Sequence, residues 1–177
     1  LQVVDIRGNI DTRIRKMKEN GYDGIILAKA GLNRLNIQDC GMYEFSIDQM
    51  IPSPCQGVLA VEIREDRKDL YNMMHEVHDE TTALQVQMER GFLKEMHADC
   101  KSPIAASAFI DHGVMTLHAM YGKEEPVSVI VQGDDTGSVV QKAAQKIRTE
   151  LSGVVSIVGA GPGDPEDITL KGLQSVR

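Results

Sequence analysis

The sequence contains no tryptophan, and aromatic residues make up only 4% of it. Any hydrophobic core must therefore be built from aliphatic side chains and from the nine methionines. No apolar run approaches the roughly 20 residues that span a membrane. The basic and then apolar pattern of a signal peptide is also lacking. We therefore expect a cytoplasmic protein with no membrane partner.

Cysteine is scarce as well: the three residues are Cys40, Cys55 and Cys100. Three scattered cysteines without a CxxC pair cannot form a disulfide framework. Free thiols in a reducing compartment are the natural interpretation.

The net charge of −7 argues against a nucleic-acid partner. The charge is uneven, because residues 1–34 hold seven Lys/Arg against four Asp/Glu, a balance of +3 that leaves −10 for the remainder. A basic segment in an acidic protein favours a small anionic ligand, with a solvated helix face as the alternative.

The first 66 residues are patterned as an α/β segment. Apolar runs predict buried strands at 1–6 and 24–28, separated by a helix that Asn9 caps and Gly21 ends. Strand, helix and strand in this order make a βαβ unit with a right-handed crossover. We further predict a helix starting at 31–37, a loop at 41–54 and a strand at 58–63.

Residues 67–152 predict a small α+β domain, in which helices cover a three-stranded antiparallel sheet. Apolar residues at helical spacing mark helices from Leu70 to Val77 and from about Asp79 to Met96. Strands follow at 104–110, 114–121 and 127–132, the first two joined by the hairpin signal Asp111-His112-Gly113. A last helix starts near Asp135 or Thr136 and runs to Leu151.

Residues 154–158 predict a new strand that runs into the glycine-rich stretch 159–164. This stretch is a weak signal for a phosphate-binding loop, because its third glycine is one position too early for GxGxxG.

Three arginines are candidate ligand-binding residues. Arg7 follows the first predicted strand, Arg13 lies in the next helix, and Arg34 follows the second strand. Ligands bind at the carboxyl edge of parallel strands, and guanidinium groups pair bidentately with carboxylates. A polycarboxylate ligand would suit this edge, and ordinary surface arginine is the alternative.

Cys100 lies in a predicted loop beside Lys101, which favours the thiolate, and Asp99, which opposes it. The alternative is an inert thiol. The histidines His75, His78 and His97 raise the question of a metal site. His75 and His78, three residues apart on a helix, could share a metal ion, but no third ligand is convincingly placed. We therefore expect solvent-facing histidines and no metal site.

Several segments, in order, resemble porphobilinogen deaminases (hydroxymethylbilane synthases). They are DIRGNIDTR at 5–13, YDGIILAKAGLNRL at 22–35, PCQGVLAVE at 54–62, HDETTA at 78–83 followed by ER at 89–90, and CKSPI at 100–104. The resemblance extends over about 150 residues. It departs from the family at Ala98-Asp99, where two glycines are usual, and at Cys55, where glycine is usual.

The resemblance implies a transferase of tetrapyrrole (porphyrin) biosynthesis, which condenses four porphobilinogen molecules into hydroxymethylbilane and releases ammonia. It implies a dipyrromethane cofactor on Cys100, with cofactor contacts from Arg7, Thr12, Arg13, Ala28, Gly31 and Arg90. Substrate contacts are implied for Arg7, Arg13, Arg34 and Gln56. The family's catalytic aspartate lies in an N-terminal domain that has no counterpart in this sequence, so no catalytic residue is assigned to this chain.

The resemblance also implies three parts. Residues 1–66 would form the C-terminal part of the second deaminase domain, which resembles periplasmic binding proteins and is incomplete here, together with a return strand. Residues 67–152 would form the C-terminal domain that carries the cofactor. The end of the chain, with VSIVGAGPGDP at 155–165 and LKGL at 170–173, is similar to the opening of uroporphyrinogen-III C-methyltransferases.

The apolar start without methionine and this methyltransferase-like end lead us to expect a cut from a larger fusion protein. S-adenosylmethionine would bind only to the complete methyltransferase domain, and the chain alone would be inactive without its N-terminal domain. The alternatives are a non-catalytic carboxylate-binding or assembly module, and part of a methyltransferase.

Overall fold

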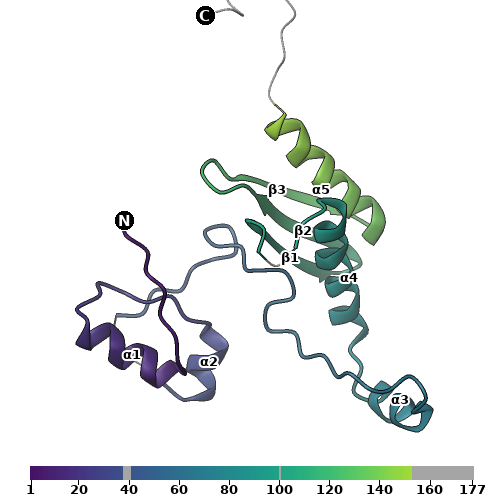
Figure 1. Cartoon of the computed structure of the whole chain (residues 1–177). Helices are drawn as coiled ribbons and strands as arrows, with labels where there is room; N and C mark the ends of the chain where they lie inside the picture. Colours follow the sequence, from purple (N-terminus) through teal and green to yellow (C-terminus); the bar gives the residue numbers. More distant parts are fainter. Residues whose placement is uncertain (38–40, 100, 153–177) are drawn as a thin grey trace, which may run out of the picture. The chain divides into compact units, whose positions relative to one another are not determined.

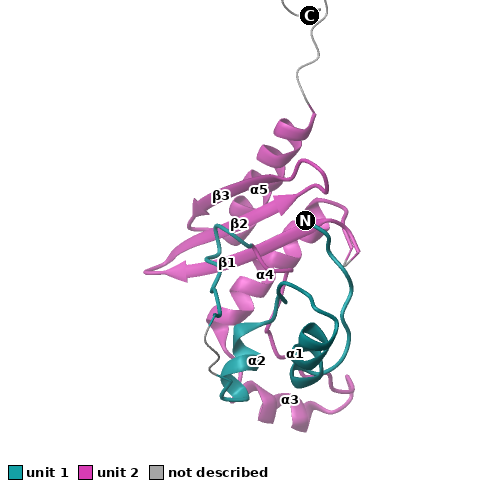
Figure 2. Cartoon of the chain, turned by 90° about the vertical axis from the view of Figure 1, so that its left-hand side faces the viewer, with its two compact units in different colours: residues 1–50 teal, residues 51–177 magenta. Residues whose placement is uncertain are grey.

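A computed structural model describes residues 1–37, 41–99 and 101–152 (Figure 1). Its contacts divide the chain into two compact units, Leu1–Met50 and Ile51–Arg177 (Figure 2). Cys40, Cys100 and the methyltransferase-like part at 153–177 lie outside the described residues. The division follows residue 50, whereas the domain boundary expected from the sequence follows residue 66, and that boundary stays a prediction.

The first unit is built around two short helices, α1 (Ile10–Glu19) and α2 (Lys29–Arg34). The predicted start of α1 is confirmed, because the Asn9 side chain accepts a hydrogen bond from Thr12 N at 2.9 Å. The predicted end is confirmed too: Gly21 follows the C-cap residue Asn20 with a φ of +66°, which glycine adopts without strain. The second helix begins two residues earlier than expected.

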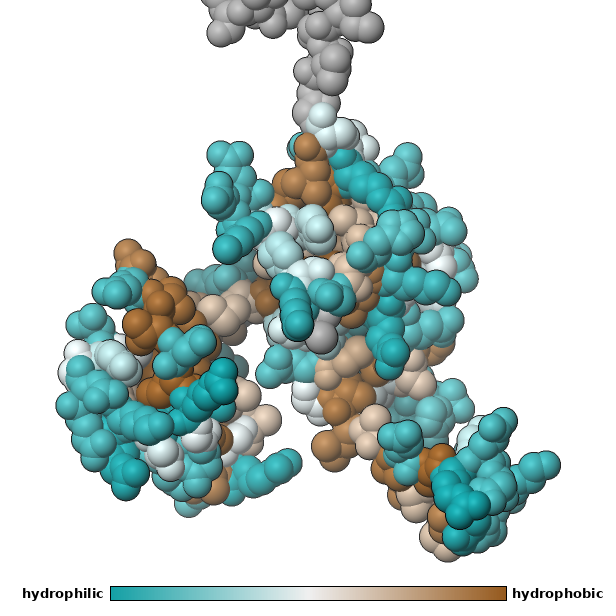
Figure 3. Space-filling model, viewed as in Figure 1, coloured by the Kyte–Doolittle hydropathy of each residue, from teal (hydrophilic) through white to brown (hydrophobic). Residues whose placement is uncertain are grey.

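The strand predictions at 1–6, 24–28 and 58–63 are wrong, since none of these residues lies in a strand. The βαβ unit is therefore not formed. A strand needs a neighbour to satisfy its backbone hydrogen bonds, and the described part of the first 66 residues offers none. The apolar side chains remain open to solvent, with Val3 85%, Ile26 67% and Leu59 91% exposed. Figure 3 shows such apolar surface on the first unit.

The second unit has the predicted order of helix, helix, three strands and helix. Its elements are α3 (Lys68–His75), α4 (Glu80–Glu95), β1 (Ile104–Asp111), β2 (Val114–Tyr121), β3 (Val127–Gly133) and α5 (Thr136–Leu151). The sheet is antiparallel in the order β1-β2-β3, as expected. Within the described ranges, no helix is both long enough and apolar enough to cross a bilayer.

The predicted hairpin between β1 and β2 is a two-residue turn. His112 has a φ of +47° and Gly113 a φ of +81°. Two central residues with positive φ match the twist of paired strands, which is why this kind of turn closes tight hairpins. The turn fixes the register at the pair Asp111 and Val114 and carries it along both strands.

The core lies between one face of the sheet and the helices α4 and α5. Its largest fully buried side chains are Phe92, Met88, Leu117, Ile147 and Val139. The expectation of an aliphatic core with methionine is confirmed, with Phe92 added. The two helices approach closely at Gly91, where a Cβ atom would lie 3.3 Å from Val140 Cγ2.

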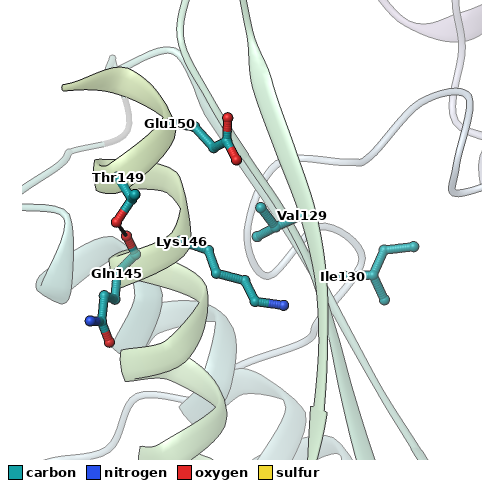
Figure 4. A pocket seen from close by; sticks show the side chains of 6 residues that line it. All are labelled: Val129, Ile130, Gln145, Lys146, Thr149 and Glu150. Carbon is teal, nitrogen blue, oxygen red and sulfur yellow. Dashed lines mark hydrogen bonds between the residues drawn. The ribbon is translucent and has the colours of Figure 1, made fainter. Parts of the chain in front are cut away.

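A shallow groove of about 490 Å³ runs between β3 and the C-terminal half of α5 (Figure 4). It is lined by Val129, Ile130, Gln145, Lys146, Thr149 and Glu150. Lys146 extends from the helix toward the strand in this view. None of the residues expected to bind cofactor or substrate lines it.

Candidate functional site

Two basic side chains of α1 hold the segment that precedes this helix. Arg13 Nε donates to Gly8 O at 2.7 Å, and Lys16 Nζ donates to Arg7 O at 3.0 Å. Gly8 has a φ of +131°, and a Cβ atom there would lie 2.8 Å from Thr12 Cγ2, so only glycine fits. Arg7, Thr12 and Arg13 are therefore brought together at the start of α1. The positive end of the helix dipole favours an anion at this end.

Helix α2 contributes the other expected contacts of the first unit. Gly31 lies against the first residue of α1: a Cβ atom at Gly31 would be 2.5 Å from Ile10 Cδ1. This close approach gives Gly31 a packing role, which the sequence did not indicate. Ala28 is the N-cap residue, and Arg34 ends the helix with its side chain exposed. Their expected contacts with a ligand stay predictions.

Gln56 and Arg90 belong to the second unit. Gln56 is exposed in a turn in which its N–H donates to Ser53 O at 3.1 Å. Arg90 is an exposed residue of α4. The guanidinium of Arg90 is near enough to the Cys55 thiol to favour its thiolate form, which on its own would lower the pKa of that thiol. The turn with Gln56 and the helix with Arg90 are thus neighbours in this unit.

Glu89 joins this turn to the helix, and the sequence analysis, which quoted it only in the ER pair at 89–90, assigned it no role. Its side chain is buried, with 8% of the residue exposed, and its two carboxylate oxygens accept from two different segments. Oε2 accepts from Cys55 N at 2.5 Å, and Oε1 accepts from Ala108 N at 2.8 Å. A signal existed, because Glu89 is a charged residue between the core positions Met88 and Phe92.

Cys55 is a half-buried free cysteine with a φ of +61°, in the left-handed region that side chains other than glycine rarely adopt. The pKa of its thiol is raised, first by burial and then by the charge of Glu89, against the opposing effect of Arg90. At neutral pH this thiol is therefore protonated and a poor nucleophile.

The loop expected to carry the cofactor is described on both sides of Cys100, which itself lies outside the described residues. Asp99 Oδ1 accepts from Lys101 N at 3.0 Å, Ser102 N at 2.9 Å and Ser102 Oγ at 2.8 Å. These bonds hold the pKa of Asp99 below its ordinary value, and the Ser102 side chain has the largest effect. The carboxylate that the sequence marked as a departure from the family is thus engaged within its own loop.

The histidines do not assemble a metal centre in the part of the chain that the structure describes, where no three metal-ligating side chains come together. His75 and His78 have ring centroids 5.5 Å apart. His97 adopts a φ of +51° directly after α4 and its C-cap.

Comparisons with known proteins show similarity to porphobilinogen deaminases. Residues 1–72 match the family described as "Porphobilinogen deaminase, dipyromethane cofactor binding domain". The chain is 39% identical over 158 residues to the porphobilinogen deaminase of Clostridium novyi (strain NT), which covers 88% of this chain and 52% of the relative. It is 40% identical over 147 residues to that of Streptococcus sanguinis (strain SK36), covering 80% of this chain and 48% of the relative.

The chain thus spans about half the length of the curated relatives it matches. The matched family range contains most of the expected binding residues, namely Arg7, Thr12, Arg13, Ala28, Gly31, Arg34 and Gln56. Arg90 and Cys100 lie beyond that range but within the length over which the relatives align.

Proposed function

We propose that this chain acts in tetrapyrrole biosynthesis as the cofactor-holding portion of a porphobilinogen deaminase. This transferase would condense four porphobilinogen molecules into hydroxymethylbilane with release of ammonia. The observation that carries the proposal is the 39% identity across 88% of the chain to a relative with that name. The match of residues 1–72 to a family described as cofactor-binding supports it independently of Cys100.

The donor set suits a dipyrromethane held by a thioether to Cys100. Two pyrrole units bring four carboxylates, and the chain offers guanidinium groups at Arg7, Arg13, Arg34 and Arg90. When bound, the dipyrromethane supplies the primer on which the polypyrrole is built. Thr12, Ala28 and Gly31 lie in the α1 and α2 segments and would line it. Removal of one bidentate arginine contact would weaken carboxylate binding by about 1–3 kcal/mol.

The role of the described residues is to bind and orient. Arg13 bonds to Gly8 O through Nε, one of five N–H groups on the guanidinium, so its orientation is fixed at the start of α1. Gln56 and Arg34 would contact incoming porphobilinogen. No general acid is assigned in this chain. We propose that the part of the relatives outside the aligned half supplies the catalytic aspartate.

Mass spectrometry of the intact chain tests the proposal. We expect the chain purified from cells that make tetrapyrroles to carry a mass excess of one dipyrromethane, and we expect Cys100→Ser to lack it. Cys40→Ser is the matched control and should keep the adduct. An adduct that survives Cys100→Ser would contradict the assignment. In an activity assay, the chain alone should make no hydroxymethylbilane, and turnover by the purified chain would overturn that expectation.

For residues 153–177 we propose the opening of an S-adenosylmethionine-dependent methyltransferase, supported by the sequence VSIVGAGPGDP at 155–165. Only the complete methyltransferase domain would hold S-adenosylmethionine. Calorimetry should therefore detect no binding of S-adenosylmethionine to this chain, and tight binding would show that the chain is itself a methyltransferase.

A further inference from the structure

The turn that carries Gln56 is fastened to the sheet and to α4 through one buried carboxylate. We propose that Glu89 is a positioning residue, which sets the place of the Pro52–Gly57 turn on the outer edge of β1 and thereby the place of Gln56. The importance of Gln56 for substrate rests on the proposed function. The role of Glu89 in holding the turn does not.

The contacts form a connected set. Ala108 N, on the outer edge of β1, donates to Glu89 Oε1 at 2.8 Å, and Cys55 N donates to Oε2 of the same carboxylate at 2.5 Å. Two residues earlier on the same edge, Ala106 N donates to Pro52 O at 3.1 Å. The turn therefore covers the edge of β1 at two points, one direct and one through Glu89.

A carboxylate is suited to this place because it offers only acceptors. Both of its neighbours are N–H donors, and a charged acceptor makes stronger hydrogen bonds than a neutral one. Burial of Glu89 would be costly without these two bonds, so the side chain and the two N–H groups satisfy one another. A glutamine at position 89 would have only one acceptor oxygen. Its NH₂ group would face one of the two backbone N–H donors, Cys55 N or Ala108 N.

The consequence for the site follows from adjacency in the sequence. Cys55 N donates a hydrogen bond to Glu89. Gln56 directly follows Cys55 in the sequence, and Arg90 directly follows Glu89. One carboxylate thus fixes the turn with Gln56 relative to the helix residue Arg90. If the hydrogen bond between Glu89 and Cys55 N is lost, the position of Gln56 relative to Arg90 is no longer fixed.

Hydrogen exchange of individual amides tests this proposal in the full chain. In Glu89→Gln we expect the amides of Cys55 and Ala108 to exchange about tenfold faster or more. The deciding amide is Ala106, which bonds to Pro52 and not to Glu89. Faster exchange at Ala106 means that the turn has left the edge. Unchanged protection at Ala106 would mean that Glu89 satisfies two N–H groups without positioning the turn, and would overturn the proposal.

Two controls make the result specific. Glu80→Gln changes an exposed glutamate in the first turn of the same helix and should leave Ala106 unchanged. Glu89→Met fits an apolar helix face and accepts no hydrogen bond, so it reports on the turn even if Glu89→Gln perturbs the fold. Protection of the central strand β2 must stay as in the unsubstituted chain for either variant to count.

Porphobilinogen binding measured by calorimetry connects the turn to the site. If Glu89 positions Gln56, then Gln56→Ala weakens binding in the unsubstituted chain but has no further effect in Glu89→Gln. Equal effects in both backgrounds would contradict the positioning role. If the unsubstituted chain does not bind porphobilinogen, the proposed function fails for this chain, and the exchange at Ala106 still decides whether Glu89 holds the turn.

Discussion

Asp99 and Ser102 form a reciprocal pair in which each side chain bonds to the backbone of the other. Ser102 N and Oγ donate to Asp99 Oδ1 at 2.9 and 2.8 Å, and Asp99 N donates to Ser102 Oγ at 3.0 Å. The pair closes a tight loop before β1 and favours the ionised form of the carboxyl group, which lowers its pKa.

This pair predicts how the loop responds to acid. Because the pKa of Asp99 is lowered in the folded chain, its stabilising effect is present above the ordinary pKa of the carboxyl group. That effect is lost as the pH falls through the lowered value. Ser102→Ala should move the pKa of Asp99 back toward its ordinary value, as measured by NMR titration of the carboxyl carbon. Ser128→Ala, on β3, is the control. An unchanged titration in Ser102→Ala would show that Ser102 does not lower this pKa.

The cap of α5 gives a prediction on stability. Asp135 Oδ2 accepts from Ser138 N at 2.7 Å, at the start of a helix that contributes five buried residues to the core. We expect Asp135→Ala to lower the free energy of unfolding by about 1 kcal/mol, measured by urea denaturation. Asp135→Asn keeps an acceptor and should cost less. Asp134→Ala lies one residue outside the cap, and an equal loss there would speak against capping.

The core can be compared with an exposed residue of the same type. Phe92 is fully buried between α4 and the sheet, whereas Phe109 is 39% exposed and contacts His118 edge to face. Phe92→Ala should cost about 3–5 kcal/mol, because it removes apolar burial and leaves a cavity. Phe109→Ala should cost about 1 kcal/mol or less. Thermal unfolding of both variants measures the difference, and similar losses would place the core elsewhere.

The backbone of Cys55 predicts an unusual order of two substitutions. Its φ of +61° suits glycine, the residue that porphobilinogen deaminases usually have at this place. Cys55→Gly should therefore be more stable than Cys55→Ala by about 1 kcal/mol in urea denaturation. At Ser53, which has no positive φ, the order should be reversed. Equal stability of the two Cys55 variants would show that the turn relaxes.

The sequence predicted those elements whose partners are close by in the chain. Helix α1 with its Asn9 cap, the His112-Gly113 hairpin and the order of the second unit all follow from local patterns. The strands expected at 1–6, 24–28 and 58–63 depend on distant hydrogen-bond partners, which an apolar run by itself does not supply. Local pattern predicts that a segment favours strand structure, but pairing decides whether a strand forms.

In the candidate site, too, the contacts between residues close in sequence were predictable, and the contacts between distant residues were not. Arg7 and Arg13 were expected near one another, and the start of α1 brings them there because they are six residues apart. The link from Glu89 to Cys55 and Ala108 joins residues 34 and 19 positions apart. Such a link needs the packed structure, because neither the charge between Met88 and Phe92 nor the ER pair at 89–90 indicates which segments Glu89 contacts.

The strand order β1-β2-β3 has a consequence for how the second unit folds. Each strand pairs with its neighbour in sequence, and α5 returns over the sheet after only two residues, 134 and 135. Short loops cost little entropy to close, and chains rich in local contacts fold quickly. We therefore expect residues 104–151 to form their structure early in folding. The helix α4 and the turn held by Glu89 would then pack against a sheet and a helix α5 that are already folded.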